Sequence, residues 1–127
     1  MQELRSVLLV GAGGFLGSIG RYLIGGWVHR LVPFAAFPVG TLVVNLSGCF
    51  LIGLLGGLAE SRQLFGADTR IFLLIGVLGG FTTFSTFAYE TLALARDADV
   101  GRVLANVGAQ VLLGLLACWL GHGVVRP

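Results

Sequence analysis

The stretch Gly79-Gly80-Phe81-Thr82-Thr83-Phe84-Ser85-Thr86-Phe87 lies halfway along an apolar segment and decides how the rest of the chain is interpreted. A helix that only anchors a protein in lipid needs neither the glycine pair nor the hydroxyl groups. Inside a bilayer, a broken helix leaves backbone groups without intrahelical partners, and such breaks persist only where protein or a bound ion satisfies them. The stretch therefore predicts a broken membrane helix with an ion site.

The composition around this stretch is that of a membrane protein. The chain has 127 residues, of which 56% are hydrophobic and 11% are charged, and its mean hydropathy is +0.94. A helix needs about 20 residues to cross the ~30 Å hydrocarbon core. Four apolar runs are long enough, which predicts an all-α membrane protein with one four-helix domain over residues 1–127 and no cleaved export signal. These runs are Val7–Val28, Val39–Ala59, Ile71–Leu94 and Val103–Val125.

Pairs of glycines four residues apart recur in the apolar runs. They are Gly13 with Gly17, Gly53 with Gly57, and Gly76 with Gly80. Small residues at this spacing let two helix backbones approach closely inside a membrane. We therefore predict that most of these glycines serve helix packing.

The arginines give almost no orientation bias, although Lys and Arg in short loops normally decide how a membrane protein inserts. A chain without bias can insert both ways, and two oppositely oriented copies would together form an inverted repeat. We therefore predict a dual-topology antiparallel homodimer, or a pair with an oppositely oriented paralogue, while a single fixed orientation is the alternative. One side of the membrane receives Arg5, Arg62, Arg70 and Arg126, and the other receives Arg30, Arg96 and Arg102, with Arg21 as a further candidate.

The break in the third run is expected near residues 79–83, where it would free backbone carbonyls such as those of Gly79 and Thr82. Carbonyl oxygens favour a hard cation. If a dimer axis passes here, two carbonyls from each chain could hold one small monovalent ion with a structural role. The alternative is a bend satisfied by side-chain hydroxyls and water.

The aromatic residues just after the break form a second candidate feature. Phe84 and Phe87 are three residues apart and therefore project from one helical face. Because an aromatic ring is positive at its edge, rings presented edge-on can line a path for an anion. The hydroxyl groups of Ser85 and Thr86 can donate hydrogen bonds along an adjacent track.

The second run contributes a buried amide. Asn45 is surrounded by apolar residues in Gly40-Thr41-Leu42-Val43-Val44-Asn45-Leu46-Ser47-Gly48, and Thr41 lies one turn earlier on the same face. A polar group inside a membrane is costly unless it has a partner. Asn45 could bind an anion through its NH2 group, or it could link two helices by a hydrogen bond.

Together these motifs resemble the Fluc family of fluoride channels, also called CrcB proteins, over nearly the whole chain. The resemblance rests on Gly20-Arg21-Tyr22, on Gly40 to Leu46, and on Gly79 to Phe87 with Glu90. It implies an antiparallel dimer in the plasma (inner) membrane, with two fluoride pores and a central sodium ion, that lowers fluoride toxicity.

The resemblance also implies roles for individual residues, while the roles of Asn106 and Gln110 stay open. Fluoride would take a hydrogen bond from Asn45. Phe84 and Phe87 would line the pore with their ring edges, Ser85 and Thr86 would provide pore hydroxyls, and Thr41 would support the same path. Arg21 would attract anions to a vestibule, and Glu90 would lie near a pore end. The backbone carbonyls of Gly79 and Thr82 would bind sodium.

Neutral donors suit fluoride because they replace its tightly held water without binding it too strongly for release. An inside-negative membrane potential would drive passive export with ~2.3 kcal/mol per charge per 100 mV. No coupled energy source is then required.

Other classes of function fit less well. A small multidrug-type cation exchanger needs a carboxylate deep in the membrane, but the first apolar run has none and Glu90 lies near the end of its span. A noncatalytic membrane assembly subunit would need only the glycine packing. The sequence has no Ser-His-acid arrangement and no basic patch, so neither an enzyme nor a nucleic-acid-binding protein is predicted.

Overall fold

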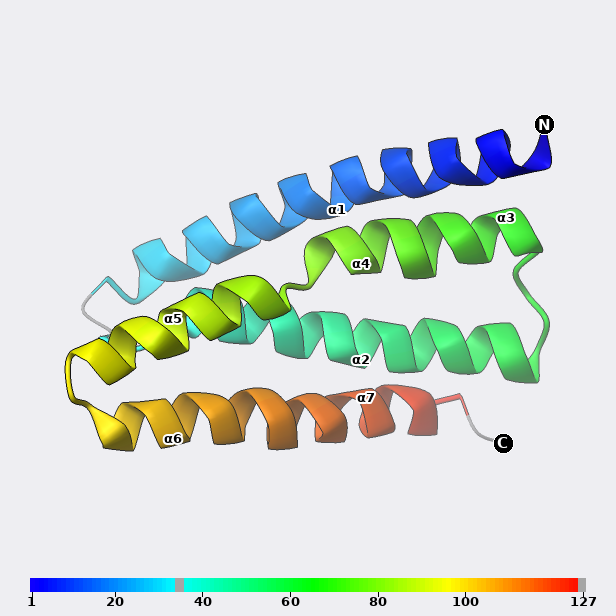
Figure 1. The fold of residues 1–127 in the computed structure, drawn as a ribbon. Helices are drawn as coiled ribbons and strands as arrows, with labels where there is room; N and C mark the ends of the chain where they lie inside the picture. The colour runs from blue at the N-terminus through cyan, green and yellow to red at the C-terminus, as the bar shows by residue number, and fades with distance from the viewer. Residues whose placement is uncertain (34–35, 126–127) are drawn as a thin grey trace.

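A computed structural model describes residues 1–33 and 36–125, and within these ranges the chain is helical with no strand. Four helical spans are long and apolar enough to cross a membrane: Gln2–Leu31, Val39–Ser61, Ala67–Arg96 and Val100–Gly123. Successive spans run in opposite directions and lie side by side (Figure 1). The predicted all-α architecture with four spans is confirmed, and the chain is a multi-pass membrane protein.

Two of the four spans are not uniform α-helices. The first and second spans are the single helices α1 (Gln2–Leu31) and α2 (Val39–Ser61). The third span consists of α3 (Ala67–Arg70), the π-helical η1 (Ile71–Val77), α4 (Leu78–Phe81) and, after an interruption, α5 (Phe84–Arg96). The fourth span consists of α6 (Val100–Gly108), the π-helical η2 (Ala109–Leu113) and α7 (Gly114–Gly123).

The helices extend further than the apolar runs predict. Four charged residues outside the predicted apolar runs lie inside helices: Glu60, Arg70, Arg96 and Arg102. Hydropathy marks only the part of a helix inside the hydrocarbon core, whereas helical hydrogen bonding continues into the hydrated interface. At the start of α6, for example, the Asp99 carboxylate accepts a hydrogen bond from the Arg102 N–H at 3.0 Å. Arg126, which contributes to the predicted charge balance, lies outside the described residues.

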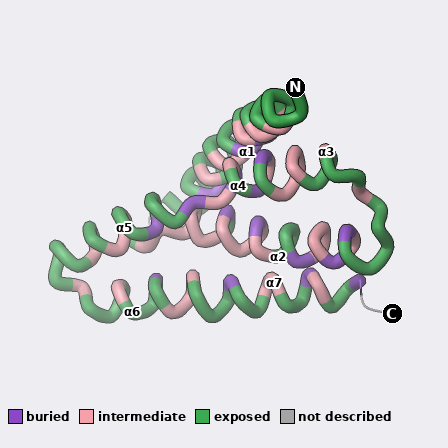
Figure 2. The backbone as a smooth tube through the Cα atoms, turned by 45° about the vertical axis from the view of Figure 1, so that its right-hand side comes forward, coloured by how far each residue is buried: buried purple, intermediate pink, exposed green. Residues whose placement is uncertain are grey.

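Close backbone contacts hold the spans together in two pairs. α1 packs on η1 and α4, and α2 packs on α7. A methyl group added to Gly76 would lie 2.9 Å from the Cα atom of Gly13, and one added to Gly80 would lie 2.9 Å from the Cα atom of Gly14. Buried positions are found where the helices face one another, while much of the outward surface is exposed (Figure 2). The predicted packing role of the glycine pairs is confirmed at these contacts.

Candidate functional site

The third span is interrupted at Thr82 and Thr83, both of which have extended backbone angles. This confirms the predicted break and narrows it from residues 79–83 to two threonines. Gly79 and Gly80 remain helical within α4. The glycine pair is therefore not the interruption itself, and Gly80 instead allows close contact with α1.

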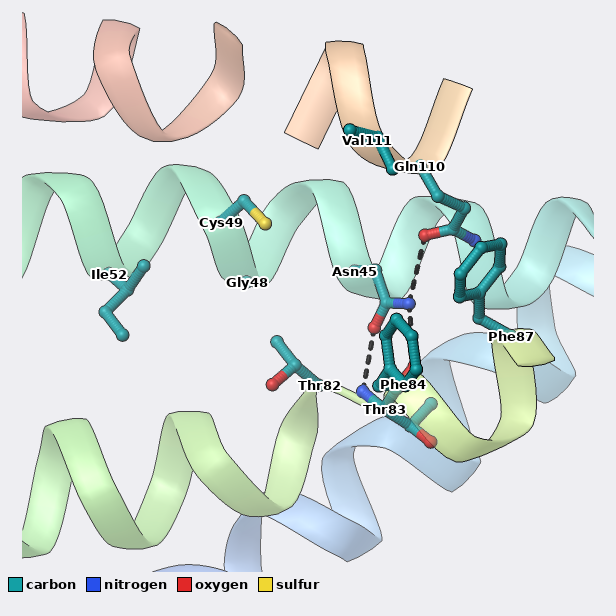
Figure 3. Close-up of a pocket in the computed structure, with 10 residues that line it drawn as sticks. All are labelled: Asn45, Gly48, Cys49, Ile52, Thr82, Thr83, Phe84, Phe87, Gln110 and Val111. Atoms are coloured by element: carbon teal, nitrogen blue, oxygen red, sulfur yellow. Dashed lines mark hydrogen bonds between the residues drawn. The ribbon is translucent and has the colours of Figure 1, made fainter. Parts of the chain in front are cut away.

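Asn45 of α2 provides hydrogen-bond partners for the backbone at the break. Its Oδ1 accepts a hydrogen bond from the Thr83 N–H at 2.8 Å, and its Nδ2 donates to the Thr83 carbonyl oxygen at 2.9 Å (Figure 3). Thr83 is buried. Because an unpaired backbone group inside a membrane costs several kcal/mol, this double contact stabilises the break. The helix-linking alternative for Asn45 is thus present in the structure, and its role as a fluoride donor stays a prediction.

The second N–H of the Asn45 amide donates to Gln110 Oε1 at 3.0 Å. Gln110 lies in η2, so this bond links the second span to the fourth (Figure 3). The sequence left the role of Gln110 open. Two amides facing each other across apolar helices could not be predicted from spacing within either helix.

Thr83 also caps the N-terminus of α5. Its Oγ1 accepts a hydrogen bond from the Thr86 N–H at 3.1 Å and donates to Thr86 Oγ1 at 3.0 Å, while Ser85 Oγ lies 3.4 Å away. A threonine that precedes a helix and bonds to its first turn is an N-cap. This pattern was available in the sequence, yet Thr83 was not predicted to be a functional residue.

The break removes the usual helical donors from several backbone carbonyls, among them those of Gly79 and Thr82. In an unbroken helix, the N–H groups of Thr83 and Thr86 would donate to the carbonyl oxygens of Gly79 and Thr82. They donate instead to Asn45 Oδ1 and to Thr83 Oγ1. The two carbonyls predicted for a cation are thus among those that lose their helical donors, together with the carbonyls of Gly80 and Phe81.

Phe84 and Phe87 lie on one face of α5, as predicted from their spacing, and their rings also contact each other. Their ring centroids are 5.4 Å apart and their planes meet at 69°, an edge-to-face arrangement. Phe87 is 7% exposed and Phe84 is 77% exposed. Both rings line a mainly apolar cavity of about 340 Å³ together with Asn45 and Gln110 (Figure 3).

A second cavity of about 340 Å³ lies beside α1, and Thr83 lines both cavities. It contains Arg21, Thr41 and Thr86. The predicted pore residues therefore fall into two groups around the break within one chain. Arg21 lies among hydroxyl groups and Ser85 is exposed beside the break, while their vestibule and pore roles stay predictions.

Glu90 lies beyond the second cavity, in a third cavity of about 360 Å³ that includes His29 and Thr41. The Thr41 hydroxyl donates to Glu90 Oε1 at 2.7 Å. On the fourth span, Asn106 is fully buried and donates to Thr91 Oγ1 at 2.9 Å. Asn106 thus links α6 to α5 away from the break, a role that the sequence had left open.

The fold and this site define a multi-pass membrane protein whose interrupted helix is lined by hydrogen-bonding groups, an arrangement that channels and transporters use to hold ions. Over residues 8–122, the chain matches the family described as "CrcB-like protein, Camphor Resistance (CrcB)". The chain belongs to this CrcB family, and the resemblance predicted from its motifs is confirmed.

Similar proteins carry names that describe an ion channel and not an enzyme. "Fluoride-specific ion channel FluC 3" of Methanosarcina barkeri is 46% identical over 119 residues, which cover 94% of this chain and 89% of the relative. "Fluoride-specific ion channel FluC" of Opitutus terrae is 50% identical over 117 residues, covering 91% and 88%. The protein of the same name from Thermus thermophilus is 50% identical over 115 residues, covering 91% and 89%.

Proposed function

We propose that this protein is a fluoride-selective channel that exports fluoride passively from the cytoplasm through a plasma (inner) membrane. The observation that carries the proposal is the uncharged amide and hydroxyl cluster of Asn45, Thr83 and Gln110 at the helix break. Membership of the CrcB family and the names of the relatives agree with it.

The chemistry of this cluster favours a small anion. The Asn45 amide and the hydroxyls near the N-terminus of α5 supply hydrogen-bond donors, and a helix N-terminus carries a partial positive charge. The edges of Phe84 and Phe87 add weak positive potential without a formal charge. Such moderate sites allow an anion to shed water, bind and move on.

Arg21 and Thr41 would attract anions and lead them toward this cluster. Their cavity meets the Phe84 cavity at Thr83, so it provides a hydrated approach to the break. The Arg21 guanidinium would concentrate anions there, the hydroxyls of Thr41, Ser85 and Thr86 would offer donors, and Glu90 would lie near the outer end of the path.

We further propose that the functional unit is an antiparallel dimer, formed with a second copy or with an oppositely oriented paralogue. The large exposure of Phe84 beside an open apolar cavity supports this, because a partner would cover the ring. Two oppositely oriented chains would provide two equivalent pores.

A structural sodium ion fits the same assembly. The carbonyls of Gly79 and Thr82 lack their helical donors, and two such carbonyls from each chain would offer four oxygens to a hard cation. A bound sodium ion would supply positive charge at the centre of the dimer and close its interface.

Sodium should therefore stabilise the dimer more than choline does at equal ionic strength. At a sodium concentration 100 times its Kd, binding to the folded dimer contributes about 2.7 kcal/mol. Thermal unfolding of purified protein in NaCl and in choline chloride measures the difference. Equal melting temperatures and equal dimer fractions in the two salts would contradict the sodium site.

Fluoride efflux from liposomes tests the proposed function directly. Vesicles that contain purified protein and a potassium ionophore should lose fluoride rapidly when the voltage is clamped, and should retain chloride. Protein-free vesicles provide the control. Folded protein that releases no fluoride would refute the channel, and exchange of organic cations for protons would point to the multidrug-type alternative.

A further inference from the structure

The hydrogen bonds at the break fix which way two side-chain amides face. The Thr83 backbone N–H can only donate, so the group opposite it must be the Asn45 oxygen. The Asn45 nitrogen then faces Gln110, and the group that receives its hydrogen bond must be the Gln110 oxygen. One backbone N–H therefore determines the orientation of both amides.

In this orientation, the side-chain nitrogen of Gln110 donates no hydrogen bond to another described residue. Gln110 Nε2 is buried and has no hydrogen-bond partner among the described residues, although a buried donor without a partner is costly. Gln110 also lies in the π-helical η2, and π-helical insertions occur frequently at functional sites. Both observations indicate that the Gln110 amide has a role other than joining two helices.

We propose that Gln110 determines anion specificity, because its Oε1 competes with the permeating anion for the Asn45 N–H. An anion that reaches Asn45 must displace this oxygen. The terminal torsion of glutamine is broad and roughly two-fold, so rotation of the amide can then present Nε2 in place of Oε1. This inference rests on the proposed channel function and deepens it.

The exchange favours strong hydrogen-bond acceptors. Before the anion displaces the Gln110 oxygen, one hydrogen bond joins the two amides, and Gln110 Nε2 has no partner among the described residues. Afterwards, the anion accepts a bond from each amide, and bonds to an ion are stronger than bonds between neutral groups. Fluoride is small and a strong acceptor, so it can displace the amide oxygen, whereas chloride is weaker and leaves the amide pair closed.

Gln110→Met provides the first test because methionine keeps the length of the side chain without either amide atom. Loss of the competing oxygen should lower the ratio of fluoride to chloride flux by about tenfold, which is the effect of roughly one hydrogen bond. Gln110→Asn, whose amide is withdrawn by one methylene, should act in the same direction. Leu112→Met is the matched control, because Leu112 lies in η2 and is 67% exposed.

The outcomes separate the two proposals. A wild-type protein that does not prefer fluoride overturns the channel function and the inference with it. A selective wild-type protein whose Gln110→Met variant keeps the same flux ratio overturns the role of Gln110 only.

Side-chain NMR gives a second test that needs no flux and no variant. The chain has five side-chain amides, in Gln2, Asn45, Gln63, Asn106 and Gln110. In ¹⁵N-labelled protein in lipid nanodiscs, sodium fluoride should shift the NH2 signals of Asn45 and Gln110 together, while sodium chloride leaves them in place. A fluoride shift at Asn45 without one at Gln110 would overturn the inference.

Discussion

Asn45→Leu should strongly reduce fluoride flux, because this one side chain pairs both backbone groups of Thr83. Leucine has the same branched shape but neither hydrogen-bonding atom. The substitution leaves a buried N–H and a buried C=O without partners, at about 1–3 kcal/mol each. If this total cost of about 2–6 kcal/mol raises the free energy of the conducting state, flux should decrease at least about thirtyfold, since 1.36 kcal/mol corresponds to a factor of ten.

Liposome efflux with equal amounts of folded protein measures this effect. Asn106→Leu is the matched control, because Asn106 is also a buried amide but bonds to Thr91 and not to the break. It should reduce stability while leaving fluoride flux within about threefold. Similar flux in wild type and Asn45→Leu would show that the break does not depend on the amide.

Gly17→Ala should prevent the first and third spans from packing. A methyl group at Gly17 would collide with the Val77 carbonyl oxygen and would lie 2.8 Å from the Phe81 nitrogen. Both contacts are with backbone, so no side chain can rotate away. Overpacking of this kind costs about 1–3 kcal/mol or more, and the required shift would move the end of α4 next to the break.

Gly11→Ala is the control for this substitution, because nothing lies within 4 Å of the added methyl group. It should stabilise the helix by about 0.5–1 kcal/mol, since alanine is the better helix former. Denaturant unfolding of the two variants in detergent micelles should therefore move in opposite directions. Equal midpoints would contradict the close packing at Gly17.

The sequence was sufficient to predict the spans and the break because both have local causes. Apolar length alone identifies a membrane helix. The Gly79–Phe87 stretch combines glycine, hydroxyl and aromatic residues that a simple membrane anchor does not need. The exact helix ends were not predictable, because hydropathy does not indicate how far a helix extends beyond the hydrocarbon core.

The contacts across the break depended on tertiary structure. The shared face of Phe84 and Phe87 follows from their spacing and was predicted, whereas their edge-to-face contact was not. The bonds from Asn45 to Thr83 and to Gln110 join residues 38 and 65 positions apart, so no local pattern contains them. Likewise, the separation of Arg21 and Asn45 into different cavities follows from how α1 and α2 pack, not from either segment.

The interruption at Thr82 and Thr83 also has an evolutionary consequence. The end of α4 presents carbonyl oxygens and the start of α5 presents N–H groups, so both polarities come from the main chain. Mutations can replace the side chains that line the break one at a time while these backbone partial charges remain. The condition is that a neighbouring side chain still forms hydrogen bonds to the extended segment at Thr82 and Thr83. Descendants of such a gene can therefore vary their conduction rates while they inherit the same site.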